Sequence, residues 1–181
     1  MLLTDQRYLD ADPGTVWAAV LDPEVLRLCI PGCQSLSGTP EAGYEAVVAQ
    51  KVGPLKARFV GHVTLSDIEE FRAVTITGEG RGGAAGHARG LARLRLEPAG
   101  LGTDLAYEVE VQVGGKLAQL GSRIIDGFTR RMADQFFTRF QAAVEGPAED
   151  AEAEGADPGE AKEPGEAAPA KTGWFRRVLS R

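Results

Sequence analysis

A long helical stripe of apolar side chains limits the fold more than any other feature of this sequence. Between about residues 116 and 145, apolar residues recur at spacings of three and four, which predicts an amphipathic α-helix roughly eight turns long. Gly146-Pro147 then ends the helical pattern. A helix with one long apolar face needs a broad apolar surface to pack against. The stripe consists of Leu117, Leu120, Ile124, Phe128, Met132, Phe136, Phe140 and Ala143.

The residues before this helix supply such a surface, because they alternate with the period of two that is typical of β-strands. The clearest case is segment 105–113, in which every second residue is apolar. Turn signals divide residues 33–113 into about six antiparallel strands, and residues 2–9 predict one more short strand. The sequence therefore predicts an α+β fold, in which a sheet of about seven antiparallel strands packs on one long helix.

Two short helices are predicted between the first strand and the rest of the sheet. Asp12-Pro13 and Asp22-Pro23 each place a capping carboxylate before a proline at the first helical position. These signals predict helices over about residues 13–20 and 23–29. Pro31-Gly32 ends the second of them.

The net charge of −6 is distributed unevenly among three parts of the chain. Residues 1–146 have a net charge of −3 and are predicted to form the folded domain. Residues 147–170 have a net charge of −7 and contain only Ala, Pro, Gly, Glu, Asp and Lys, which predicts a disordered linker. Residues 171–181 have a net charge of +4 and predict a short amphipathic segment.

This last segment separates apolar from basic side chains when it is drawn as a helix. The composition is typical of a helix at a membrane interface and predicts contact with anionic lipid. A peptide that docks on a partner protein and an end without function are the alternative interpretations. The predicted membrane contacts are Trp174, Phe175, Val178 and Leu179 on the apolar face, with Arg176 and Arg177 on the basic one.

Several classes of function are disfavoured by the rest of the sequence. No apolar run approaches the roughly 18 residues that span a bilayer, and the first residues lack a secretory pattern, which favours the cytoplasm. No basic stripe with interleaved aromatic residues precedes residue 147, which argues against nucleic-acid binding. Cys29 and Cys33 are interpreted as buried apolar residues rather than reactive thiols. His62 and His87 are predicted to face solvent, which disfavours a metal site.

Glycine and alanine occupy several inward positions at strand centres, among them Ala46, Gly61 and Ala92. A close-packed core needs that volume occupied. The pattern therefore leaves two interpretations open, namely an apolar ligand cavity, or an ordinary core behind a sheet that bends at its glycines. Lys116 and Arg123 either lie in solvent or meet the polar group of a ligand at the cavity mouth. The predicted ligand-binding residues are Phe59, Gly90, Tyr107, Leu117, Leu120, Arg123, Ile124 and Phe128.

Four motifs in this order resemble the G-subunit family of carbon monoxide dehydrogenase over about residues 1–145. They are DPEVLRLCIPGCQSL, KVGPLKARFVGHVTL, GEGRGGAAGHARG and GGKLAQLGSRIIDGFTRRMADQFFTRF. The resemblance implies a helix-grip fold of the START/Bet v 1 type. In that fold a curved antiparallel sheet wraps around a long C-terminal helix and encloses an apolar cavity.

The resemblance also implies a functional setting. The family accompanies molybdenum-containing carbon monoxide dehydrogenases and related molybdenum hydroxylases as an accessory factor linked to membrane recruitment. The implied partners are such an enzyme complex and the inner face of the cytoplasmic membrane, with which this protein would associate peripherally. The predicted cavity and the amphipathic segment 171–181 together lead to the hypothesis of a non-catalytic carrier. Its ligand would be a respiratory quinone, either menaquinone or ubiquinone.

Two alternatives to the carrier remain open from the sequence. One is a scaffold or assembly factor that recruits the enzyme to the membrane without a ligand. The other is a cyclase- or hydrolase-type enzyme for a hydrophobic substrate, which would need an acid–base group inside the pocket. The predicted inward positions include Tyr44 and Tyr107 but no His, Asp or Glu, which weakens the enzyme hypothesis.

Overall fold

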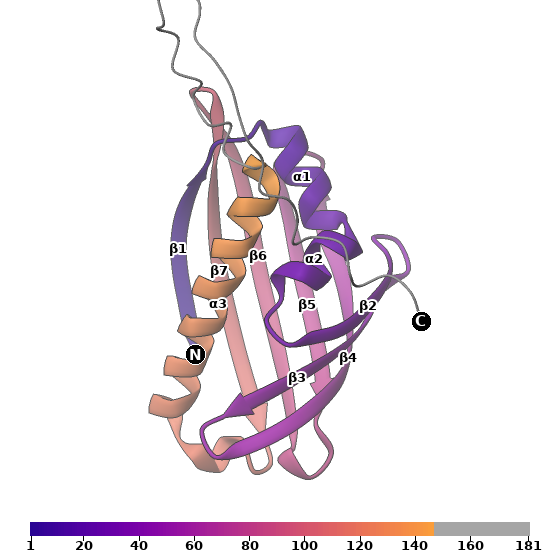
Figure 1. The fold of residues 1–181 in the computed structure, drawn as a ribbon, viewed down its shortest axis with the longest axis vertical. Helices are drawn as coiled ribbons and strands as arrows, with labels where there is room; N and C mark the ends of the chain where they lie inside the picture. The colour runs from indigo at the N-terminus through magenta and orange to yellow at the C-terminus, as the bar shows by residue number, and fades with distance from the viewer. Residues whose placement is uncertain (147–181) are drawn as a thin grey trace, which may run out of the picture. The chain divides into compact units, whose positions relative to one another are not determined.

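The computed structural model describes residues 1–146, so the predicted linker 147–170 and terminal segment 171–181 lie outside the described residues. The described chain contains seven strands and three α-helices (Figure 1). The elements are β1 (Leu2–Leu9), α1 (Pro13–Leu21), α2 (Pro23–Cys29), β2 (Cys33–Thr39), β3 (Gly43–Val52), β4 (Leu55–Glu69), β5 (Ala73–Arg81), η1 (Gly83–Ala85), β6 (His87–Ala99), β7 (Gly102–Gly114), η2 (Ala118–Leu120) and α3 (Ser122–Glu145).

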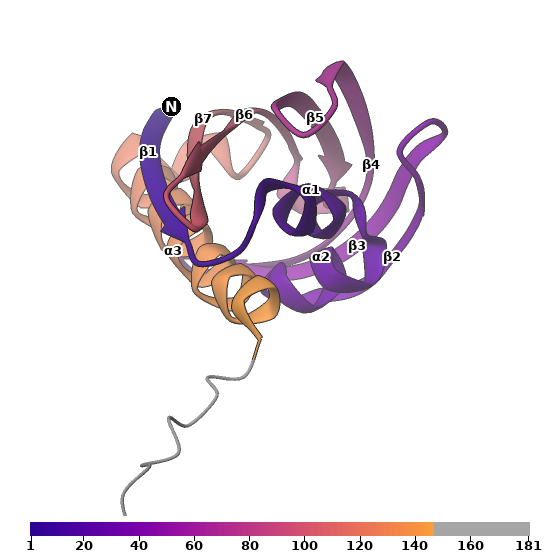
Figure 2. The same cartoon turned by 90° about the horizontal axis from the view of Figure 1, so that it is seen from above.

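The seven strands form one antiparallel sheet in the order β1-β7-β6-β5-β4-β3-β2. Figure 2 shows that the sheet curves into an arc, with α3 across the open side and α1 and α2 at one end. The α+β architecture predicted from strand alternation and the long apolar stripe is therefore confirmed. Burial alternates along the strands, as in β4, so the concave face is covered and the convex face is exposed.

Helices α1 and α2 begin where the Asp-Pro signals predict. Asp12 accepts hydrogen bonds from the backbone N–H groups of Gly14 and Thr15, and Asp22 caps the second helix in the same way. The pair is held to the sheet by two buried hydroxyls. Thr103 Oγ1 donates to the Ala11 carbonyl at 2.7 Å, and the Tyr44 hydroxyl donates to the Leu21 carbonyl at 2.8 Å.

The long helix α3 begins at Ser122, so the prediction of a start near residue 116 was wrong. Gly115 and Gly121 both adopt left-handed backbone conformations, with φ of 71° and 83°, and these interrupt a regular α-helix. Between them lies the single 3₁₀ turn η2. Leu117 and Leu120 therefore belong to a connecting turn below the helix and not to its apolar face.

The apolar face of α3 also differs in phase from the predicted stripe. Ile125, Phe137 and Phe140 are its buried residues, whereas Ile124 is 39% exposed and Ala143 faces solvent. Four residues turn an α-helix by about 400°, so each step of four rotates the side chain by about 40°. A stripe built on steps of four therefore winds around the helix, and its two ends leave the buried face.

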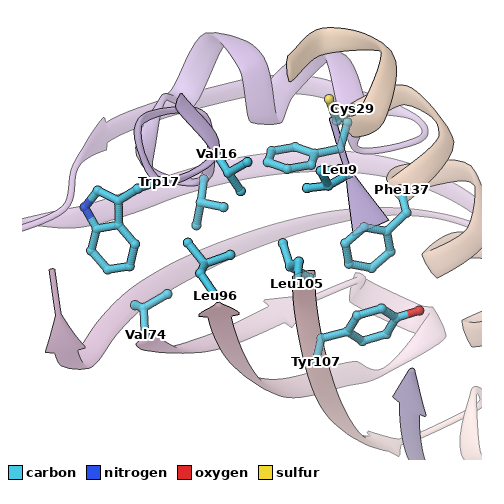
Figure 3. Close-up of a cluster of buried hydrophobic side chains, with 11 residues drawn as sticks. Leu9, Val16, Trp17, Cys29, Val74, Leu96, Leu105, Tyr107 and Phe137 are labelled. Atoms are coloured by element: carbon cyan, nitrogen blue, oxygen red, sulfur yellow. The ribbon is translucent and has the colours of Figure 1, made fainter. Parts of the chain in front are cut away.

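The interior contains two separate apolar clusters. The large cluster joins α1, α2, the second half of α3 and strands β1, β5, β6 and β7, and Figure 3 shows part of it. The small cluster joins β3, η2 and the first turns of α3. The large cluster consists of Leu9, Val16, Trp17, Val20, Cys29, Val74, Leu96, Leu105, Tyr107, Phe137 and Phe140, and the small cluster of Val52, Leu117 and Ile125.

Small residues line the concave face between the two clusters. Gly78 pairs with Gly90 across β5 and β6, and Ala46 pairs with Gly61 across β3 and β4. A Cβ atom added at Gly90 would find only the Glu110 carbonyl oxygen near it, at 3.9 Å. The space in front of Gly90 is therefore not filled by neighbouring side chains, as expected for a partly hollow interior.

Candidate functional site

An apolar cavity of about 280 Å³ lies between α3, the end of α2 and the concave face of β5, β6 and β7. This volume is near the lower end of the range for small-molecule pockets, roughly 300–1,000 Å³. The wall from the helices and the Ile30-Pro31 turn consists of Val20, Leu26, Ile30, Pro31, Thr129, Met132, Ala133, Phe136, Phe137 and Phe140. The wall from the sheet consists of Ile76, Ala92, Leu94, Leu105, Tyr107 and Val109.

Aromatic side chains of α3 and β7 pack against one another in this wall. The rings of Tyr107 and Phe137 stack with centroids 4.3 Å apart, as the close-up in Figure 3 shows. Phe136 meets Phe137 edge-on at 5.1 Å and stacks with Phe140 at 5.6 Å. Offset and edge-on pairs of this kind are the favoured aromatic geometries. The wall therefore presents flat, polarisable surfaces to the cavity.

The two polar side chains of the lining already have hydrogen-bond partners. Thr129 Oγ1 donates to the Ile125 carbonyl at 2.9 Å, and the Tyr107 hydroxyl donates to Asp5 Oδ2 at 3.3 Å. Burial raises the pKa of Tyr107, so its phenol stays neutral at physiological pH. No acid, base or histidine is among the lining residues. The cavity therefore suits an apolar ligand and offers little for general acid–base chemistry.

One ionic cluster closes the edge of the sheet next to the aromatic wall. Arg7 Nη2 on β1 lies 2.9 Å from Asp134 Oδ1 on α3 and 3.1 Å from Asp5 Oδ2. The guanidinium also lies 5.9 Å from the centre of the Phe137 ring. Its interaction with Tyr107 raises the pKa of Arg7. The cluster ties β1 to α3, which fixes the side of the cavity formed by Tyr107 and Phe137.

The structure separates the predicted ligand-binding residues into four places. Tyr107 lines the cavity. Gly90 lies on the concave face between the two clusters, and Arg123 and Ile124 are exposed on the first turn of α3. The remaining residues lie in or against the small cluster rather than on the cavity wall, and they are Phe59, Leu117, Leu120 and Phe128.

The sequence patterns did not predict that the α2 end and Phe137 contribute to the wall. Leu26, Ile30 and Pro31 enter the wall because the backbone at Gly32 and Ala49 is hydrogen-bonded, which places the start of β2 beside β3. Only the CIPG segment, apolar residues just before a Pro-Gly stop, offered a signal for this. The predicted contacts Trp174, Phe175, Arg176, Arg177, Val178 and Leu179 lie outside the described residues.

The cysteines and histidines lie away from the cavity lining. Cys29 is 1% exposed, and burial raises the pKa of its thiol, which fits the interpretation as a core residue. His62 and His87 are exposed as predicted, and His62 Nδ1 lies 2.7 Å from Glu45 Oε1. Within residues 1–146, no three His, Cys, Asp or Glu side chains gather as metal ligands would. None of the helices described is both long and apolar enough to cross a bilayer.

A sequence model of one protein family, described as the carbon monoxide dehydrogenase G subunit (CoxG), matches residues 6–145. The chain belongs to the CoxG family. The match begins within β1 and ends at the last residue of α3, so it covers nearly all of the described domain. A search of curated proteins returned no match to this CoxG-family sequence.

Solved structures confirm the helix-grip fold of this CoxG-family member. A conserved protein from Geobacillus kaustophilus is 26% identical, with a TM-score of 0.73, over 80% of this chain and 95% of that one. Protein CV1439 from Chromobacterium violaceum is 18% identical, with a TM-score of 0.60, over 80% and 97%. Ara h 8.0201 is 16% identical, with a TM-score of 0.59, over 80% and 97%. The likeness to the last two shows the fold alone.

Proposed function

We propose that this protein is a non-catalytic carrier that binds a respiratory quinone, menaquinone or ubiquinone, in its cavity. It delivers the quinone to a molybdenum-containing carbon monoxide dehydrogenase or a related molybdenum hydroxylase at the membrane. Family membership supports the enzyme partner. The observation that carries the ligand class is the apolar cavity, whose two polar side chains are already hydrogen-bonded within the protein.

The shape of the interior supports a ligand with a flat ring and an apolar tail. Phe136, Phe137 and Tyr107 offer aromatic surfaces against which a quinone ring stacks. A cavity of about 280 Å³ is small for a whole isoprenoid quinone, so the tail must extend beyond it. The open space in front of Gly90, on the concave face next to Ala92, offers the nearest route.

The sequence that follows the described domain supports peripheral association with the inner face of the cytoplasmic membrane. Trp174 and Phe175 would enter the interface, while Arg176 and Arg177 would meet anionic headgroups. The acidic linker 147–170 would act as a tether between this contact and the domain. Deletion of residues 172–181 is expected to weaken the binding of the protein to anionic vesicles, and unchanged binding would contradict the anchor.

The direct test of the carrier is to identify what the protein binds. Protein purified from a quinone-producing host is extracted with organic solvent, and the extract is analysed by mass spectrometry. We expect an isoprenoid quinone from the wild type and none from Ala92→Phe, which fills the cavity. Gln112→Phe is the matched control, because Gln112 is exposed on the convex face of β7. A wild-type extract without quinone or another isoprenoid would refute the carrier.

The scaffold alternative is separated by a second measurement on the same variants. Capture of the dehydrogenase and electron transfer to membrane quinone are measured with wild type, Ala92→Phe and Gln112→Phe. The carrier predicts that Ala92→Phe still captures the enzyme and no longer supports electron transfer. If both activities survive the filled cavity, the protein acts as a recruitment scaffold and the quinone proposal fails.

A further inference from the structure

The two ends of the folded domain have opposite charge. One end is formed by the β3–β4 turn, the β5–β6 turn and the connection from β7 to α3, and we call it the basic end. Its residues, 49–58, 80–88 and 113–126, include one acidic side chain, Asp126. The exposed basic side chains of the basic end are Lys51, Lys56, Arg58, Arg81, Lys116 and Arg123.

The opposite end, formed by residues 9–14, 39–43, 67–72, 97–104 and 145, is strongly acidic. Its only basic side chain is Arg72. The acidic side chains there are Asp10, Asp12, Glu41, Asp67, Glu69, Glu70, Glu97, Asp104 and Glu145. The domain therefore has a charge asymmetry along the direction of its strands, which orients it in the field of a charged surface.

The three connections that form the basic end contact one another. An added Cβ atom at Gly53, on the β3–β4 turn, would lie 3.4 Å from Ile124 Cγ2, next to Arg123. Leu117, which follows Lys116, donates its backbone N–H to the Ala85 carbonyl at 3.0 Å. The three connections therefore form one continuous surface.

The charges on this surface are not neutralised within the domain. Among the described residues, none of the six basic side chains of the basic end takes part in an ion pair. Lys51 and Lys56 lie directly opposite each other on β3 and β4, an arrangement of like charges that destabilises a strand pair. An anionic partner would relieve the repulsion between these two lysines.

We propose that the basic end is a second membrane contact, which binds the surface of an anionic bilayer. Ile124 supports lipid over an acidic protein, because it is 39% exposed and lies beside Arg123, so that an apolar side chain accompanies the bases at the contact. Each Lys or Arg near an anionic bilayer strengthens binding about fivefold. This contact is independent of what the cavity holds and of the contact predicted for residues 171–181.

The chain is long enough for both contacts to meet the same membrane. α3 has 24 residues and is therefore about 36 Å long, which approximates the distance between the two ends. The 24 residues of segment 147–170 can reach at most about 80 Å. The reach of this segment exceeds the length of α3, so both contacts are compatible with a single bilayer.

The test uses the full chain with Trp174→Ala and Phe175→Ala, so that residues 171–181 contribute less to membrane binding. Binding is measured to vesicles of phosphatidylcholine alone and of phosphatidylcholine mixed with phosphatidylglycerol. We expect binding that requires phosphatidylglycerol and falls about 25-fold in Lys51→Gln/Lys56→Gln. Arg72→Gln/Arg95→Gln removes the same charge from exposed bases away from the basic end, and less than a twofold change is expected.

A reporter at each end tests the orientation in the same background. Tryptophan at Ile124→Trp should shift its emission to the blue on phosphatidylglycerol vesicles. Tryptophan at Leu101→Trp should not shift, because Leu101 is 93% exposed on the β6–β7 turn at the acidic end. Equal losses from the two double variants, or equal shifts from the two reporters, would overturn the proposal. Binding without a preference for phosphatidylglycerol would also overturn the proposal, and it would favour an acidic protein as the partner of this surface.

Discussion

The two apolar clusters of the domain differ in size and in the elements that build them. The large cluster has eleven buried residues from seven elements, including both ends of the chain's described part. The small cluster has three buried residues and is supplied by a hairpin strand, a glycine-flanked turn and the first turns of α3. The concave face between them is lined by glycine and alanine. This contrast suggests that one end holds the fold together while the other closes the interior.

A division of this kind is physically reasonable for a protein that admits an apolar ligand. In the proposed carrier, the well-packed end would keep the sheet curved and α3 in place during ligand exchange. A thinly packed end opens at a small cost in free energy, since local opening depends on the apolar contacts that must be broken.

The largest expected effect is the loss of a side chain from the large cluster. Phe140 is fully buried and contacts Phe136 in the cavity wall, so Phe140→Ala should lower the free energy of unfolding by about 4 kcal/mol. Urea denaturation measures this change. Gln135→Ala, at an exposed position on the same helix, should change it by less than about 0.5 kcal/mol. A loss below about 1 kcal/mol in Phe140→Ala would contradict the assignment of this cluster as the stable end.

A smaller effect is expected from the same kind of change in the small cluster. Leu117 is 2% exposed but has few buried neighbours, so Leu117→Ala should cost about 2 kcal/mol, near the low end for buried leucine. Amide hydrogen exchange should become faster in residues 115–125 and stay unchanged in α1 and β1. Gln119→Ala is the exposed control on the same turn. Exchange that accelerates equally in all elements would show that the two clusters unfold together.

The smallest expected effect is a pH dependence to which two buried side chains of the large cluster contribute. Burial raises the pKa of Cys29 and of Tyr107, both of which lie there. A raised folded-state pKa means that the stabilisation is complete below the unfolded pKa, about 8.5 for cysteine and 10 for tyrosine. It is then lost as the pH rises toward the folded value. The melting temperature should therefore fall above about pH 8.5, and less steeply in Cys29→Ala. An identical slope in that variant would exclude the thiol as a contributor.

The strands and caps could be predicted from the sequence because their causes are local. Alternation of apolar residues in segment 105–113 depends only on the period of a strand, and β7 has the predicted inward set. Asp12 and Asp22 cap the helices that follow them directly. The start of α3 was missed because Leu117 and Leu120 continue the helical spacing across Gly121, whose left-handed backbone no spacing rule shows.

The candidate site was less predictable because it depends on the rotation of α3. The predicted stripe does not show which side of α3 faces the sheet. In the structure Phe137, which lies outside the stripe, stacks on Tyr107, whereas Ile124 of the stripe is exposed. The residues from the α2 end entered the cavity wall through long-range backbone pairing, which neighbouring residues do not encode.

The sequence by itself determined the element types, the uneven charge of the three chain segments and the shortage of large side chains at strand centres. These follow from residue identity and from periods of two and 3.6, which act over a few residues. Only the tertiary structure decided where the unfilled volume lies, which α3 residues face it and which bases gather at one end. Those properties arise when sheet curvature and helix rotation bring distant segments together, because packing and charge act through space rather than along the chain.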